Sequence, residues 1–246
     1  MAITETVNRL RLVTGQQLER LHFEELTGRS RAVVRWRVLR RLVEWRLLVP
    51  LERRVGGARA GSGGLVYALD TAGQKLLQLH RSLEPDAAPV RRPGAPGERF
   101  VQHSLAVSEL YVQLREIERA GSFRLSVFDA EPHSWWPDGR GSLLKPDAFV
   151  ALSTTEYDHA TWVEVDRSTE SLPTLKRKLG VYVDFVRCGQ LGPGDVVPRV
   201  LVTVLSQARG DAVEGLIEGL PSPARELLSV VVYERAAEEL VRGMDG

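Results

Sequence analysis

The 246-residue chain has little cysteine and no long apolar run. Its single cysteine, Cys188, excludes an internal disulfide and a cysteine-based zinc site. No apolar stretch approaches the roughly 20 residues that cross a bilayer, so we expect no membrane segment. The first residues lack the charged-then-apolar pattern of a signal peptide, and we expect a cytoplasmic protein.

Two common catalytic signatures are also missing. The glycine-rich stretch GGARAGSGG lacks the Gly-Lys-Ser/Thr ending of a phosphate-binding loop, so we do not expect ATP hydrolysis. The five histidines are scattered at positions 22, 80, 103, 133 and 159, which argues against a histidine-cluster metal site. With 43% hydrophobic and 26% charged residues, the composition is that of an ordinary globular protein.

Charge is distributed unevenly along the chain. Residues 1–82 hold 15 Lys and Arg against 7 Asp and Glu, a balance of +8, whereas the remainder holds 18 against 25, a balance of −7. Between the two parts, residues 83–99 are rich in proline, which is typical of a linker. We therefore predict a basic domain over 1–82 that contacts a polyanion and a second domain over 100–246.

The basic part has the periodicity of three helices followed by a hairpin. The expected elements are helices over residues 4–13, 15–23 and 30–48, a β-hairpin whose tip is GGARAGSGG, and a helix over 71–80. Ser30 is the predicted N-cap of the third helix. Trp36 and Trp45, on that helix, are expected to pack in the domain rather than to stack on bases.

This order of elements resembles a winged helix-turn-helix, and RVLRRLVEWRLLV followed by LVYALDTAGQKLL carries the resemblance. It implies binding of double-stranded DNA through the third helix and the wing. The arginines expected to contact DNA are Arg29, Arg31, Arg35, Arg37, Arg53, Arg54 and Arg59. The alternative is a solvated face with intrahelical partners, such as Arg40 with Glu44.

The C-terminal part is predicted as α-β-β-β-α-β-α. Its strands are expected near residues 123–131, 143–152, 160–166 and 197–206, and its helices near 101–119, 172–186 and 210–220. The continuous apolar run VLVTVL favours a strand that is buried on both faces.

Carboxylates mark the ends of two of these strands. Asp147 follows Pro146 at one strand, and Glu164 and Asp166 alternate with valines on the next, so both point to the same face. Such oxygen ligands suit Mg²⁺ or Mn²⁺, which can activate water beside a phosphate. Carboxylates this close together repel one another unless a cation or a basic side chain lies between them, and Arg167 or Lys178 would serve without any metal.

The order of elements resembles the PD-(D/E)xK nuclease fold. The resemblance implies a metal site at Asp147 and Glu164, with Glu109 on the preceding helix as a third ligand. Asp166, however, stands where that fold has its catalytic lysine. Either the lysine has migrated to Lys178 or Lys176, with Lys145 a weaker candidate, or the domain is a non-catalytic scaffold that needs no cofactor.

The whole chain resembles the replication-relaxation family of bacterial plasmids and integrative elements, above all through WVEVDRSTESLPTLKRKLGVY. The resemblance implies a winged helix joined to a nuclease-like α/β domain and a role in replication, relaxation or transfer of mobile DNA. Three interpretations stay open: a metal-dependent nuclease or nickase with Asp147, Glu164, Asp166 and Lys178 at its site, a non-catalytic regulator or accessory protein, or a specificity adaptor that brings a transfer ATPase to DNA. A homodimer and contacts with DNA-transfer or replication proteins are further expectations.

Overall fold

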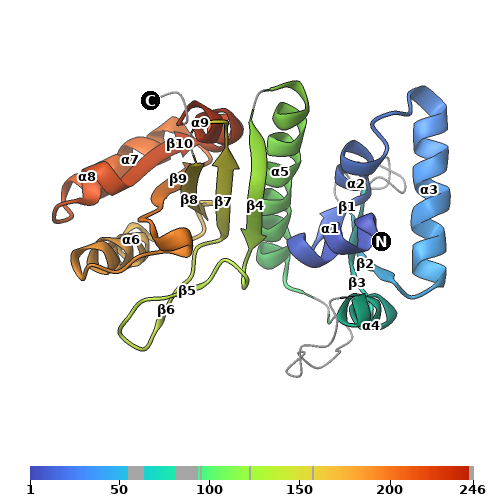
Figure 1. Ribbon diagram of the computed structural model, residues 1–246, viewed down its shortest axis with the longest axis horizontal. Helices are drawn as coiled ribbons and strands as arrows, with labels where there is room; N and C mark the ends of the chain where they lie inside the picture. The colour runs from blue at the N-terminus through green and yellow to red at the C-terminus, as the bar shows by residue number, and fades with distance from the viewer. Residues whose placement is uncertain (55–63, 81–93, 95, 122, 157, 244–246) are drawn as a thin grey trace. The chain divides into compact units, whose positions relative to one another are not determined.

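A computed structural model describes the chain except for residues 55–63, 81–93, 95, 122, 157 and 244–246. It divides into two compact units, Met1–Val112 and Gln113–Gly246, which are described separately (Figure 1). Both are mixed assemblies of helices and strands, which confirms the predicted α/β class. Among the described residues, no helix combines the length and the apolar character needed to cross a membrane.

Unit 1 is built around a small antiparallel sheet. Its elements are α1 (Ala2–Leu10), β1 (Val13–Thr14), α2 (Gly15–His22), α3 (Gly28–Glu44), β2 (Leu48–Arg54), β3 (Leu65–Leu69), α4 (Thr71–His80) and the first part of α5 (Glu98–Ala120). The strand order is β1-β3-β2, and β3 pairs antiparallel with both neighbours. The predicted hairpin is therefore present as β2 and β3, whereas its glycine-rich tip lies outside the described residues.

Local capping explains where the short helices begin. Thr14 accepts a hydrogen bond from the Gln17 backbone N–H, and the Gln17 side chain accepts one from the Thr14 N–H in return, which forms a capping box for α2. The predicted cap of α3 is wrong by three residues, because Thr27 is the N-cap and the Ser30 hydroxyl donates back to the Thr27 carbonyl. The helix thus starts at Gly28, one turn earlier than its apolar periodicity indicates.

The first part of α5 belongs to unit 1 rather than to the predicted second domain. The Ser108 hydroxyl donates to the Leu12 carbonyl at 2.6 Å, and Val101 and Leu105 join Leu12 and Val66 in one apolar cluster. The linker predicted over residues 83–99 lies mostly outside the described residues, and its last two residues start α5. The division between the compact units falls within this helix, which composition alone does not reveal.

Unit 2 contains a five-stranded mixed sheet. Its elements are the last part of α5, β4 (Arg124–Ala130), β5 (Trp136–Pro137), β6 (Leu143–Leu144), β7 (Ala148–Ser153), β8 (Asp158–Val165), α6 (Leu172–Arg187), β9 (Arg199–Val204), α7 (Gln207–Glu218), α8 (Ala224–Leu227), β10 (Leu228–Val232) and α9 (Ala236–Arg242). The strand order is β10-β9-β8-β7-β4. The pairs around β7 are antiparallel, and β8, β9 and β10 run parallel.

The predicted α-β-β-β-α-β order is present in unit 2, with two differences. The single strand expected over residues 143–152 is split, because Pro146 interrupts it and β6 pairs with β5 in a separate hairpin. The tail also holds a fifth strand, β10, that the prediction left unassigned. It aligns in parallel with β9, and α7 and α8 connect the two strands.

One face of this sheet carries the largest apolar cluster of unit 2. Side chains of α6 and α7 pack on it, and the fully buried Trp162 of β8 lies at its centre. The ring centroids of Tyr182 and Phe185, both on α6, lie 5.6 and 5.4 Å from that of Trp162. Helix α6 is thereby held firmly against the strand that carries Glu164.

Candidate functional site

Sheet register brings Asp147 and Glu164 together in unit 2. Ala148 pairs with Val163 across β7 and β8, so the next step of the antiparallel ladder sets Asp147 opposite Glu164. The Asp147 backbone N–H donates to the Val163 carbonyl at 3.0 Å. The Val165 N–H donates to Oδ2 of Asp147 at 2.7 Å. Two carboxylates that the sequence separates by 17 positions thus share one end of the strand pair.

Lys178 lies between these two carboxylates. Its Nζ is 3.7 Å from Oδ1 of Asp147 and forms an ion pair with Oε2 of Glu164. It stands in the second turn of α6, which begins after the Ser171 cap. Of the three lysines considered, this is the one that the structure brings to the carboxylate pair: Lys176 is exposed, and Nζ of Lys145 lies 4.8 Å from the centroid of the Trp135 ring.

Tyr182 completes the cluster from the next turn of α6. Its hydroxyl donates to Oε1 of Glu164, and the side chain is buried. Tyr182 also packs on Trp162 in the core of unit 2. It was not among the predicted site residues, although its four-residue spacing from Lys178 is a signal that both share a helix face. We call Asp147, Glu164, Lys178 and Tyr182 the carboxylate–lysine cluster.

Burial and neighbouring charge shift the protonation of this cluster. Burial, followed by the charge of Asp147, raises the pKa of Glu164 from 4.5 to about 8. Burial alone would lower the pKa of Lys178, but Glu164 and Asp147 outweigh it and hold that pKa above its ordinary value. Burial and the charge of Glu164 raise the pKa of Tyr182. Glu164 is therefore the group on which the cluster takes up a proton near neutral pH.

This raised pKa predicts how the stability of unit 2 depends on pH. Between pH 4.5 and about 8 the folded chain holds a proton on Glu164 that the unfolded chain releases. The free energy of unfolding should therefore fall as pH rises through this interval, by up to about 1.4 kcal/mol per pH unit. Lys178 does not alter the sign between pH 4.5 and 8, because its pKa is 10.5 in the unfolded chain and higher in the folded one, so it is charged in both states.

Glu164→Gln should flatten this pH dependence, because glutamine does not titrate. Chemical unfolding of wild type and variant at pH 5, 6, 7 and 8 measures the free energy of unfolding at each pH. Hydrogen exchange of peptides from β7 and β8 shows whether the change lies in unit 2. Equal slopes for both proteins would contradict the assignment of the titration to Glu164.

Asp166 is bound by a different cation. Nε of Arg209, on α7, donates to Oδ2 of Asp166 at 2.6 Å, and Nη2 donates to the Glu170 carbonyl at 2.9 Å. The Ser168 N–H donates to Oδ1 of Asp166 at 2.8 Å. The residue that replaces the expected lysine is therefore the acidic half of an ion pair. Arg209 was missed, since no local pattern links it to a strand 43 positions earlier.

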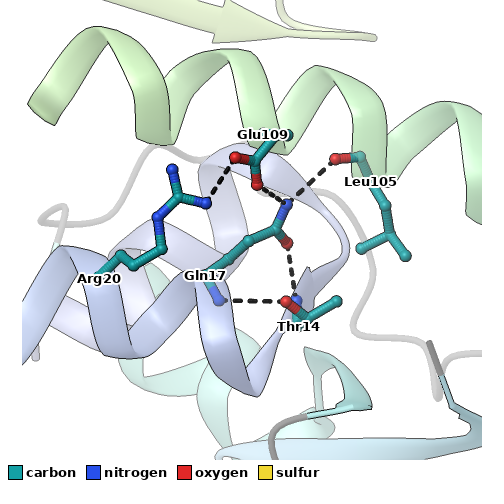
Figure 2. A network of polar contacts seen from close by, with 5 residues as sticks. All are labelled: Thr14, Gln17, Arg20, Leu105 and Glu109. Atoms are coloured by element: carbon teal, nitrogen blue, oxygen red, sulfur yellow. Dashed lines mark hydrogen bonds and ion pairs between the residues drawn. The ribbon is translucent and has the colours of Figure 1, made fainter. Parts of the chain in front are cut away.

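Glu109 is engaged within unit 1, as Figure 2 shows. Its Oε1 lies 2.5 Å from Nη1 of Arg20, and its Oε2 accepts a hydrogen bond from Nε2 of Gln17 at 3.0 Å. Gln17 also donates to the Leu105 carbonyl. Both carboxylate oxygens of Glu109 thus have partners on α2, and its role as a metal ligand stays a prediction. Within the described residues, no group of three or more His, Cys, Asp or Glu side chains is arranged to hold a metal ion.

The remaining pair of carboxylates fits a divalent cation in part. Asp147 and Glu164 each keep one oxygen on a protein donor and direct the other, Oδ1 and Oε2, towards the ammonium of Lys178. A hard cation prefers such carboxylate oxygens and completes its shell with water or phosphate oxygens. These two residues would hold it, and Lys178 now supplies the positive charge at that position.

The predicted DNA-contacting arginines fall into three groups. Arg29 and Arg37 are exposed on α3, whereas Arg31 and Arg35 pair with Glu19 of α2. Arg53 and Arg54 lie in β2, with side chains outside the described part of the chain, as is the whole of Arg59. The expectation that Trp36 and Trp45 are packed is wrong, because these side chains are 46% and 57% exposed.

Fold and site together define a two-unit mixed α/β protein whose second unit holds a buried carboxylate pair bridged by a lysine. The family model of replication-relaxation proteins matches residues 5–200, which is most of the chain. The chain belongs to the replication-relaxation family, and this membership suggests a role in plasmid replication or relaxation. No curated protein and no solved structure matches the chain.

Proposed function

We propose that this protein binds double-stranded DNA of plasmids or other mobile elements and cuts or nicks it with the help of a divalent cation. The observation that carries the catalytic part is the position of Lys178, in contact with both Asp147 and Glu164. A lysine beside two strand-end carboxylates is the arrangement expected when the catalytic lysine has migrated from its strand to the following helix.

The DNA-binding part rests on unit 1. The order α1-β1-α2-α3-β2-β3, with an antiparallel sheet, supports the winged-helix interpretation. In that fold the third helix enters the major groove. Helix α3 presents Arg29, Arg37, Arg40 and Arg41 on exposed positions, and Glu44 is the acidic residue among its exposed side chains. Such a surface attracts phosphates, and the affinity should fall steeply with salt.

Each residue of the carboxylate–lysine cluster would have a defined task. Asp147 and Glu164 would hold the cation through the oxygens that face Lys178, while Val165 and Tyr182 orient the two carboxylates by hydrogen bonds. Lys178 is the most exposed member and would neutralise the incoming phosphate. A bound Mg²⁺ or Mn²⁺ supplies an activated water and stabilises charge on the phosphate.

A second candidate is a non-catalytic DNA-binding regulator or accessory protein. Glu164 is 1% exposed, and Lys178 already neutralises its charge. A cluster whose charges neutralise one another would hold α6 against the sheet. In this interpretation unit 2 would mediate dimerisation or recruit replication or transfer proteins.

Cleavage of supercoiled plasmid separates the two candidates. Wild type with Mg²⁺ or Mn²⁺ should convert the plasmid to nicked or linear DNA, and EDTA should stop the reaction. Asp147→Asn and Glu164→Gln should each reduce the rate by about 100-fold or more, because each removes a charged metal ligand. Asp158→Asn is the matched control, since it alters an exposed carboxylate at the other end of β8.

Binding is measured alongside cleavage by gel shift with the same plasmid fragments at two salt concentrations. Salt-sensitive binding without metal-dependent cleavage would rule out the nuclease and support the non-catalytic regulator or accessory protein. If neither binding nor cleavage occurs at low salt, the proposal as a whole is wrong.

A further inference from the structure

Helix α3 has an unusually exposed apolar surface for a helix of a folded unit. Among its 17 residues, Leu39 is the one fully buried side chain. Val33 and Trp36 are 44% and 46% exposed. A surface helix normally hides its large apolar side chains, and exposed aromatic residues mark contact surfaces. The helix is nevertheless well anchored, because Arg31 and Arg35 pair with Glu19 on its inner side.

The exposed residues form one stripe along the helix. Helical spacing places Arg29, Val33, Trp36, Arg37 and Arg40 on the same side, and we call them the α3 stripe. The Arg40 guanidinium lies 5.2 Å from the centroid of the Trp36 ring. Within the described part of the chain, no acidic side chain pairs with Arg29 or Arg37. The stripe therefore has an apolar centre and cationic flanks.

The charge of the α3 stripe indicates which class of molecule it can bind. The α3 stripe contains three arginines, and Glu44, one turn further along the same side of the helix, pairs with Arg40 at 2.7 Å, which leaves Arg29 and Arg37 as its uncompensated cations. Two copies of the stripe facing each other would oppose arginine to arginine, which costs free energy. A polyanion complements this surface, as the proposed DNA binding requires.

Phosphates alone do not account for the apolar centre of the stripe. An exposed indole gains free energy only where it buries apolar surface, and the arginines already suffice for phosphate contacts. In the major groove, the apolar group that DNA offers is the C5-methyl of thymine. We propose that Trp36 contacts thymine methyl groups, so that α3 discriminates thymine from bases without the methyl. This inference rests on the proposed DNA binding and adds a specificity determinant to it.

Replacing thymine by deoxyuridine tests the proposal, because the change removes the methyl and keeps base pairing. Duplexes are selected by wild type from a pool with a random 20-base-pair core, and the enriched sequences are remade with deoxyuridine. Wild type should bind them more weakly, by about fourfold for each methyl contacted. Trp36→Ala should bind both forms with equal affinity.

Trp45→Ala is the matched control, since Trp45 follows Trp36 by two and a half helical turns and so lies on the opposite side, where its exposed ring contacts Arg41. This variant should keep the preference for thymine. A second measurement does not depend on the variants: duplexes with 5-bromodeoxyuridine at the thymine positions are photo-crosslinked to wild type. The adduct should map to residues 26–44 and, within them, to Trp36.

The outcomes separate this inference from the proposed function. Equal affinity of wild type for thymine and deoxyuridine duplexes, or adducts confined to other segments, would overturn the role of Trp36 while DNA binding stands. A thymine preference that survives in Trp36→Ala would also overturn it. If wild type enriches and binds no duplex at low salt, the DNA binding itself is refuted, and the inference falls with it.

Discussion

Replacing Lys178 by Met is expected to destabilise unit 2 by about 3–5 kcal/mol at pH 9, because it leaves Asp147 and Glu164 buried side by side without a cation. The loss should shrink at pH 6. The pKa of Glu164 is about 8 in wild type and rises further without Lys178, so Glu164 is uncharged at pH 6 in both proteins and only Asp147 loses its cation. Urea unfolding at the two pH values, with hydrogen exchange of β7 and β8 peptides, measures the effect.

Two further variants locate the cause of this loss. Lys176→Met removes an exposed lysine two positions earlier on α6 and should change stability by less than about 0.5 kcal/mol. The double variant Glu164→Gln/Lys178→Met removes both charges and should recover much of the lost stability at pH 9. A Lys178→Met loss that is independent of pH would contradict the ion-pair explanation and would point to lost packing of the lysine stem.

Replacing Arg209 by Met is expected to cost about 3 kcal/mol, because it removes the cationic partner of Asp166, whose side chain is only 3% exposed. Arg209 also binds the Glu170 carbonyl, immediately before the Ser171 cap of α6. The variant should therefore loosen the start of α6 as well as the end of β8. Thermal unfolding, together with faster hydrogen exchange over residues 165–175, would reveal both effects.

An exposed ion pair provides the comparison for Arg209. Arg225 lies 3.8 Å from Glu218 with both side chains largely exposed, so Arg225→Met should cost less than about 1 kcal/mol. Asp166→Asn/Arg209→Met should be more stable than Arg209→Met alone, since it leaves no unpaired charge. If Arg209→Met lost as little stability as Arg225→Met, the stabilising role of the buried Arg209–Asp166 pair would be contradicted.

The main helices and strands of both units could be predicted from the sequence because they depend on local spacing, whereas β10 and the split at Pro146 were not predicted. Alternation of Glu164 and Asp166 with valines marked a strand, and the four-residue apolar spacing of α3 marked a helix. The nuclease-fold resemblance implied that Asp147 and Glu164 share a site, and the antiparallel pairing of β7 with β8 sets them opposite one another. These features depend on residues that are close in the sequence.

The other contacts of the charged residues join positions that are far apart in the sequence, so local patterns did not predict them. Arg209 meets Asp166 only because α7 follows the parallel strand β9, and Glu109 is bound by Gln17 and Arg20 from elements about 90 positions earlier. Likewise, the exposure of Trp36 depends on which side of α3 faces the rest of unit 1, and helical periodicity alone does not identify that side when arginines occupy both. Local sequence thus determined which charged groups the chain carries and on which elements. Tertiary packing decided which of them compensate one another, because burial makes an unpaired charge costly and so selects partners regardless of their distance along the chain.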